Sequence, residues 1–421
     1  MWGKRRDEAE ASLLALNGLN FSVSAMQAGF GAFVPVRLAA AGWDPGAIGM
    51  ALSVSTIASM AAQVPSGAVI DHFSGKRALA AIAIGVSMLA LLLLATIASV
   101  PIVVLAQVMQ GGAGVGLTLA IACVTLSLAR QDVLGERLGK NVRYAAVGAA
   151  VGAAGLGLAG SFVSGRAVFL LAACFGIPAL LSLRWIHPVA LASPETRTTH
   201  HTAPPRPKRK TPAVSPWRLL RDRRILVFFA CVVMFHLGNA TLLPLAATSF
   251  FHHAGRNADL LTAVAVTGPQ LITALLSPWV GSLAETYGRR SIMMLGFCAV
   301  PLRAVLFSID AGPGFMLASE MLDGVSAATF GVMMPLVVAD ITHRGGRFNL
   351  TLGMMGLAAG LGATVSTSAG GWIADVAGLH VAFLVLAVVG CGTVLLIWAL
   401  LPETSHLPRA LPVVATRNPA T

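Results

Sequence analysis

The sequence predicts an all-α membrane protein with about twelve transmembrane helices in two six-helix bundles, and with both termini in the cytoplasm. Three observations support this fold class. Apolar residues make up 56% of the 421 residues and charged residues only 11%, long apolar runs recur along the chain, and its two halves share a motif. Because a water-soluble fold would expose far more charge, lipid must cover much of this surface.

The apolar runs predict the individual spans. A spanning helix needs about 20 apolar residues. Runs of about this length occur at 12–36, 47–70, 78–98, 102–129, 142–163, 167–187, 225–247, 259–280, 291–310, 313–339, 349–370 and 380–401. We therefore expect an N-terminal bundle at 1–187, a cytoplasmic linker at 188–224, a C-terminal bundle at 225–401 and a cytoplasmic tail at 402–421.

The basic residues predict the orientation. With the N-terminus inside, 25 of the 29 Lys and Arg residues fall on the cytoplasmic side or its helix ends, while Arg37, Arg166 and Arg256 lie outside and Arg303 lies within a span. This positive-inside bias accounts for the net charge of +12 without a nucleic-acid partner. The Pro- and Arg-rich linker is interpreted as a flexible tether, with attraction of its PRPKRK run to anionic lipid as the alternative.

Other classes of function are not expected. All five cysteines lie inside predicted spans, which indicates neither a disulfide framework nor a metal site. Adjacent His252 and His253 lack further metal ligands, and no GKS or GKT follows the Gly-rich stretches at 152–160 and 353–362. We expect no cofactor, no metal and no enzymatic activity. A membrane sensor or scaffold is a remote alternative, because the longest soluble segment is the 37-residue linker.

One motif aligns the two halves. GAVIDHFSGKRA, which begins at Gly67, resembles GSLAETYGRRS, which begins at Gly281, and both follow the second span of their half. The copies lie 213 or 214 residues apart, because the first contains one extra residue. Duplication explains this repeat. Two related six-span bundles predict a solute-binding site at the seam between them.

The motif is similar to the G-x-x-x-D-x-x-G-x-[RK]-[RK] pattern of the major facilitator superfamily, and the likeness covers nearly the whole chain. The resemblance implies a cavity between two bundles that rock to expose it to each side in turn, and a motif loop that acts as a conformational latch for the outward-facing state. A carboxylate in this loop can cap the N-terminus of a neighbouring helix, where it meets the helix dipole and free N–H groups. An ordinary positive-inside hairpin is the alternative. The latch residues are Gly67, Asp71, Lys76, Arg77, Gly281, Glu285, Arg289 and Arg290.

The fourth span bears on the direction of transport. Drug:proton antiporters of the superfamily usually carry R-x-x-Q-G there, with the Arg assigned to proton coupling. Here Gln107 takes the Arg position, while Gln110, Gly111 and Gly114 match. The fifth span has the glycine density of the antiporter signature without its proline. The resemblance favours proton-coupled efflux of a drug-like or metabolite-like molecule, and import by symport or uniport stays open as the alternative.

Three charged residues lie well inside predicted spans: Arg303 in the ninth, and Glu320 and Asp323 in the tenth. Each costs roughly 2.5 to 3.5 kcal/mol at a helix centre. Their depths match, and spacing of i and i+3 puts both acids on one helix face, so an ion pair between the helices is expected. One acid then neutralises Arg303, and the other, for which we choose Asp323, carries the proton. A fixed buried network is the alternative.

Polar residues on cavity-lining helices are the candidate substrate contacts, although amides more often join helices. They are Asn20, Gln27, Gln107, Gln110, His236 and Asn239. We expect a monomeric, multi-pass protein of the cytoplasmic (inner) membrane, whose partners are a small-molecule substrate, protons and membrane lipid.

Overall fold

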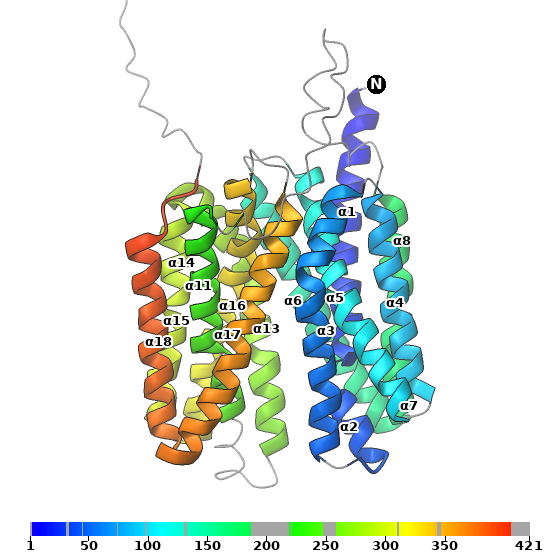
Figure 1. The fold of residues 1–421 in the computed structure, drawn as a ribbon. Coiled ribbons are helices and arrows are strands. Elements are labelled where there is room, and N and C mark those ends of the chain that lie inside the picture. The colour runs from blue at the N-terminus through cyan, green and yellow to red at the C-terminus, as the bar shows by residue number, and fades with distance from the viewer. Residues whose placement is uncertain are drawn as a thin grey trace, which may run out of the picture.

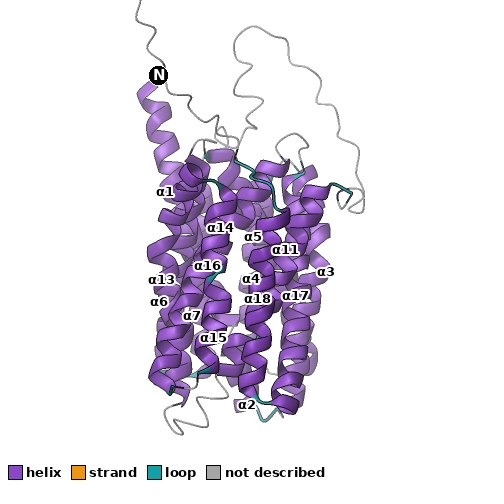
Figure 2. Ribbon diagram, turned by 90° about the vertical axis from the view of Figure 1, so that its left-hand side faces the viewer, coloured by secondary structure: helices purple, strands orange, loops and turns teal. Residues whose placement is uncertain are grey.

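The computed structural model describes residues 2–30, 33–43, 45–73, 75–96, 99–129, 133–186, 219, 221–246, 258–309, 311–342 and 347–405. Within these ranges every regular element is a helix, as the purple ribbons of Figure 2 show. Most of the predicted linker at 188–224 and of the predicted tail at 402–421 lies outside the described residues.

The N-terminal bundle occupies the right-hand side of Figure 1. Its elements are α1 (Trp2–Gln27), the 3₁₀ turn η1 (Ala28–Phe30), α2 (Phe33–Ala40), α3 (Pro45–His72), α4 (Lys76–Thr96), α5 (Val100–Leu128), α6 (Leu134–Phe162), α7 (Gly165–Cys174) and α8 (Gly176–Trp185). The C-terminal bundle lies beside it. Its elements are α11 (Arg223–Asn239), α13 (Ala258–Tyr287), α14 (Arg289–Phe297), α15 (Ala299–Ser308), α16 (Pro313–Thr342), α17 (Phe348–Ala377) and α18 (Leu379–Leu400).

The predicted fold class of about twelve spans is confirmed. Among the described residues, nine helical segments are long and apolar enough to cross a membrane, with α7 and α8 together forming one of them and α14 and α15 another. The helices α1, α3 and α13, with 26, 28 and 30 residues, run along the bundles beside these segments (Figure 1).

Two boundaries differ from the sequence prediction. The helix α6 begins at Leu134 rather than at 142, and its added turns hold an ion pair of 2.6 Å between Glu136 and Lys140. This i,i+4 pair supports a helix that extends beyond the hydrocarbon. The first predicted span, in contrast, is divided by η1. There a Cβ on Gly29 would lie 2.6 Å from Cβ of Ala172, so glycine lets the chain pack closely on α7.

The helix α1 begins and α18 ends at the same end of the molecule (Figure 1), which the charge distribution identifies as cytoplasmic. The bundles meet where α3 packs on α17 and α6 packs on α13. Glycines allow these helices to approach closely. Among the described glycines, those that contact the opposite bundle all lie in the cytoplasmic halves of their helices: Gly67, Gly135, Gly139, Gly281, Gly331, Gly353, Gly356 and Gly360.

Candidate functional site

At the cytoplasmic end, the carboxylate of Asp71 on α3 reaches across to the first turn of α17. Its Oδ1 accepts hydrogen bonds from the backbone N–H of Asn349 at 3.1 Å and from its Nδ2 at 2.8 Å, and its Oδ2 accepts one from the N–H of Leu350 at 2.9 Å. The first N–H groups of a helix have no partner within that helix, and the helix dipole favours an anion there. Asp71 therefore caps a helix of the opposite bundle.

The second copy of the motif makes the equivalent contact. Glu285 on α13 accepts a hydrogen bond of 2.5 Å at Oε1 from the backbone N–H of Gly135, in the first turn of α6. A Cβ on Gly281 would collide with the backbone at Gly135, just as a Cβ on Gly67 would collide with the carbonyl of Asn349. Each motif thus combines a close glycine contact with a carboxylate that caps the other bundle.

The arginines of the two motifs make contacts within their own bundle. Nη2 of Arg77 donates to the carbonyl of Arg184 at 3.4 Å, and Nη2 of Arg290 donates to the carbonyl of Trp398. Both carbonyls lie near the C-terminus of the last helix of their bundle, where a cation interacts favourably with the helix dipole. Arg289 is buried and pairs with Asp340 at 3.2 Å. The charge of Lys76 acts on Asp71.

A further carboxylate follows the last helix. Glu403 accepts hydrogen bonds from the N–H groups of Arg289 at 2.8 Å, Arg290 at 3.1 Å and Ser405 at 3.0 Å. Partial burial alone would raise the pKa of Glu403, but these backbone N–H groups outweigh it and hold the pKa below the usual value. Thr404 donates to Asp340 at 3.2 Å. The residues after α18 therefore cap α14 at the second motif.

The predicted charges inside the membrane form one cluster. Nη1 of Arg303 lies 3.2 Å from Oε1 of Glu320 and 2.7 Å from Oδ1 of Asp323, and Nη2 donates to Oδ1 of Asn239 at 2.6 Å. The side chain of Arg303 is only 2% exposed. Oε2 of Glu320 and Nε of Arg303 are buried without a hydrogen-bond partner. One cation thus shares its charge between two acids from α16.

The two acids differ in access. The side chain of Glu320 is 1% exposed and that of Asp323 is 27% exposed. Asp323 lies on the same face of α16 as Phe330 and Met334, since spacings of 7 and 11 residues return to one side of a helix. Phe330 and Met334 line a cavity between the bundles. Asp323 therefore lies on the side of α16 that forms the cavity wall about two turns further along the helix, whereas Glu320 is buried against Arg303 of α15.

The cavity at the seam has a volume of about 510 Å³. Its N-terminal wall carries hydroxyl and amide groups, and its C-terminal wall is mostly apolar. Among the described residues that line it, none is charged. They are Ser55, Ser59 and Gln63 of α3; Gln110, Gly111, Gly114, Val115, Thr118, Leu119 and Ala122 of α5; and Phe330, Gly331, Met334, Pro335, Leu352 and Gly356 of α16 and α17.

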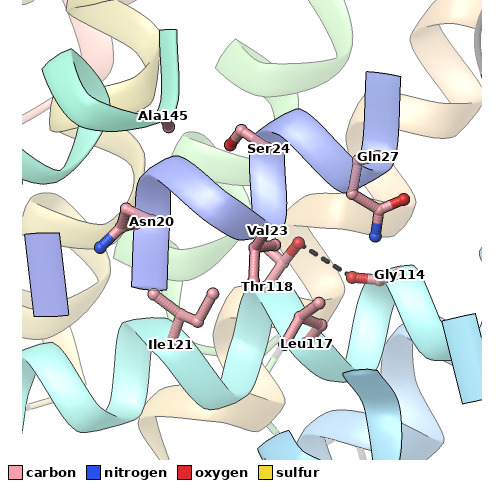
Figure 3. A pocket seen from close by; sticks show the side chains of 9 residues that line it. All are labelled: Asn20, Val23, Ser24, Gln27, Gly114, Leu117, Thr118, Ile121 and Ala145. Carbon is pink, nitrogen blue, oxygen red and sulfur yellow. Dashed lines mark hydrogen bonds between the residues drawn. The ribbon is translucent and has the colours of Figure 1, made fainter. Parts of the chain in front are cut away.

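A second cavity of about 400 Å³ lies within the N-terminal bundle, between α1, α5 and α6. Figure 3 shows Asn20, Ser24 and Gln27 of α1 on one side and residues of α5 on the other. The two cavities share Gly114 and Thr118. At this junction Gln110, which lines the seam cavity, donates a hydrogen bond to Gln27, which lines the second cavity.

The remaining candidate substrate residues, including Asn20 of the second cavity, make contacts within the protein. Gln107 is 2% exposed and donates to the carbonyl of Ala51 at 3.3 Å, so it joins α5 to α3. Nδ2 of Asn20 donates a hydrogen bond of 2.8 Å to the carbonyl of Leu16 in its own helix. His236 packs edge-on against Phe330, with ring centroids 4.8 Å apart.

A buried cation in the first bundle was not predicted. Arg137 on α6 is 7% exposed and donates to Asn17 at 2.6 Å and to Asn141 at 2.8 Å. Asn141 in turn donates to Thr125 at 2.7 Å. Placing the fifth span at 142–163 put Arg137 in a cytoplasmic loop. Arg137 and Asn141 are four residues apart, which places both on one face of a helix. This spacing was the sequence signal that the fifth span begins before residue 142.

Comparison with known proteins gives a consistent result. The sequence pattern of the Major Facilitator Superfamily matches residues 16–268 and 240–417. The chain is 32% identical over 399 residues to the uncharacterized MFS-type transporter Rv2456c of Mycobacterium tuberculosis, covering 93% of each chain. It is 25% identical over 136 residues to the class B tetracycline resistance protein of Escherichia coli, covering 32% of this chain and 33% of that one. The structure resembles that of the E. coli fucose:proton symporter with a TM-score of 0.71 and 14% identity, covering 92% of this chain and 97% of that one.

Proposed function

The chain belongs to the Major Facilitator Superfamily, and we propose that it is a secondary active transporter that exports a small drug-like or metabolite-like molecule in exchange for protons. It is a multi-pass protein of the cell membrane. Export is supported by the similarity of part of the chain to a tetracycline resistance protein and by the match of Gln110, Gly111 and Gly114 to the antiporter pattern.

Asp323 is the proposed proton carrier. This assignment rests on one observation: two acids contact a single buried guanidinium, and Asp323 is the more exposed of the two. One carboxylate suffices to neutralise Arg303. A second carboxylate can therefore take up a proton without leaving the guanidinium unneutralised. Glu320 then holds Arg303 while Asp323 exchanges its proton with the cavity.

The two motifs are the proposed latch of the outward-facing state. Asp71 and Glu285 cap helices of the opposite bundle, and both contacts lie at the cytoplasmic end. Opening the cytoplasmic side requires both caps to break. The caps therefore stabilise the arrangement in which the cytoplasmic side is closed.

The test uses proteoliposomes loaded with a small-molecule extract of cells. Mass spectrometry follows which solutes leave when the outer medium is made acidic and when no pH gradient is imposed. We expect the gradient to accelerate the exit of one solute or a small group of related solutes. Protein-free liposomes and liposomes with the Asp323→Asn variant should not show this acceleration. If no solute leaves faster than from protein-free liposomes, transport is contradicted. If a solute leaves at the same rate with and without the pH gradient, proton coupling is contradicted.

Import with protons is the second candidate. It is favoured by Gln107, which stands where the antiporter pattern has its Arg and which bonds the backbone of α3. The same proteoliposomes distinguish the two directions, because symport accumulates an external solute when the outer medium is acidic. Accumulation of an external solute, without acid-driven exit of an internal one, would contradict export and support import.

A further inference from the structure

The glutamine pair at the junction of the two cavities has unused hydrogen-bonding capacity. Nε2 of Gln110 donates to Oε1 of Gln27, and Oε1 of Gln110 is buried with no hydrogen-bond partner. An unpaired buried acceptor carries a desolvation cost that a donor would relieve. The pair is therefore suited to a ligand that donates a hydrogen bond to Gln110.

The same place also offers a donor. A Cβ on Gly114 would lie 3.6 Å from Nε2 of Gln110 and 3.7 Å from Nε2 of Gln27, so both amide nitrogens border the space that the glycine leaves open. One N–H of Gln110 is used within the pair. If both amides were turned over, the pair would still retain a free N–H and a free carbonyl. The junction thus presents a donor and an acceptor side by side.

The surroundings restrict what binds there. Across the seam the wall consists of apolar side chains that include Phe330, Met334 and Leu352, and among the described lining residues of both cavities none is charged. Burying a charge without a partner costs far more than burying a paired amide. The ion cluster at Arg303 offers no unpaired cation to an anionic ligand, because its one cation already contacts two acids, and neither acid is among the described residues that line the two cavities.

We propose, building on the transport function proposed above, that the substrate is an uncharged amphiphile whose polar edge carries a hydrogen-bond donor next to an acceptor, as in a lactam. The donor binds Oε1 of Gln110 and the acceptor binds an amide N–H of the pair. The apolar body lies against Phe330 and Met334. Gly114 provides the opening through which the polar edge reaches both glutamines.

Binding of three matched probes to the purified full-length protein tests this proposal. Carbostyril is a bicyclic lactam with adjacent N–H and C=O groups, N-methylcarbostyril lacks the donor, and quinaldate carries a carboxylate on a ring system of the same size. Isothermal titration calorimetry in detergent measures their affinities. We expect carbostyril to bind about tenfold more tightly than N-methylcarbostyril, because the methylated probe leaves Gln110 unpaired. Quinaldate should bind most weakly.

Variants separate the glutamine pair from general effects of the fold. Gln110→Leu should weaken carbostyril about tenfold and abolish its preference over the N-methyl probe. Gly114→Leu should weaken both neutral probes, because its side chain fills the space in front of the amides. The matched control is Gly116→Leu on the same helix, where a Cβ would meet no atom within 4 Å. Circular dichroism and the melting temperature check that each variant is folded.

Three outcomes would overturn the proposal: equal affinity for the two neutral probes, tightest binding of quinaldate, or no binding of any probe to folded wild-type protein. These results would leave the proposed transport function standing, since gradient-driven exit is measured separately with a cell extract. Conversely, selective probe binding without solute exit would retain this site and contradict transport.

Discussion

The guanidinium of Arg303 concentrates several roles in one side chain. It contacts Asn239 from α11 and both acids of α16, so it joins three helices at a depth where an unpaired charge is expensive. Sequence depth alone predicted its pairing with Glu320 and Asp323. The structure shows the contacts and adds Asn239, which had been considered only as a substrate contact.

Charge reversal at this cluster should be complementary. Arg303→Glu leaves three acids together and Asp323→Arg leaves two cations beside one acid, so each single variant should lower the melting temperature and abolish transport, because breaking a buried pair costs about 3–5 kcal/mol. The double variant restores one cation between two acids. We expect it to recover part of both properties, as measured by thermal unfolding and proteoliposome flux. No recovery in either would contradict pairing.

The two acids should respond differently to neutralisation. Asp323→Asn should leave solute exchange in the absence of a gradient but remove its acceleration by an acidic outer medium. Glu320→Gln should retain that acceleration, because Asp323, the more exposed acid, remains in place. Both variants lose one carboxylate, so each serves as the control for the other. If both lose coupling equally, the cluster acts as a fixed network rather than through one carrier.

At the scale of elements, each motif joins helix ends that are far apart in the chain. The cap of Asp71 on α17 spans 278 residues of sequence, so local patterns predicted the carboxylate without its partner. The internal repeat was more informative. It related Asp71 to Glu285, and the structure shows each of them capping a helix of the opposite bundle.

Asp71→Asn should weaken the cap on α17. The asparagine amide has one oxygen where the carboxylate has two, so it cannot accept all the hydrogen bonds that Asn349 and Leu350 donate. Loss of a cap costs roughly 1 kcal/mol. Transport should fall while expression stays normal. Spin labels at exposed Phe73 and Tyr287, in a cysteine-free background, should show a larger population with separated cytoplasmic ends. Unchanged distances together with normal transport would reject the latch and favour an ordinary hairpin.

The cap of Glu403 on α14 should depend on pH. Its pKa is below the usual value in the folded protein because backbone N–H groups hold the carboxylate despite its burial. Its stabilising contribution is therefore complete above the unfolded value of 4.5 and is lost as the pH falls through the lower folded pKa. Glu403→Gln should melt at a lower temperature than wild type near neutral pH, and this difference should shrink below about pH 4.5. A difference that is constant with pH would contradict the cap.

At the scale of the molecule, composition, charge placement and the repeat were enough to predict the membrane fold, the number of spans and the seam. They could not predict which amides face that seam. Gln107 and Gln110 look alike in sequence, yet Gln107 donates a hydrogen bond to the backbone of α3 and Gln110 lines the seam cavity. The distinction depends on the rotation of α5 against its neighbours. Arg137 and Glu403 were missed because both lie just beyond the apolar runs.

The cytoplasmic contact between the bundles should require glycine. Gly281→Val places a Cβ in collision with the carbonyl oxygen of Gly135, so the cytoplasmic ends should separate and the label distances should lengthen. Gly85→Val is the matched control on α4, since a Cβ there would meet no atom within 4 Å. Lengthening in both variants would point to general destabilisation rather than to loss of this contact.

Asp71 and Glu285 are received mainly by main-chain amides of the opposite bundle, and every residue type except proline supplies such an amide. The main-chain part of each cap thus does not depend on which side chain the receiving residue carries, although Gly135 must stay small because a Cβ there would lie 2.6 Å from the carbonyl oxygen of Gly281. After a gene duplication, a position such as Leu350 can change without loss of the amide that Asp71 caps. This leaves the two halves free to diverge in what they bind while they continue to fit together.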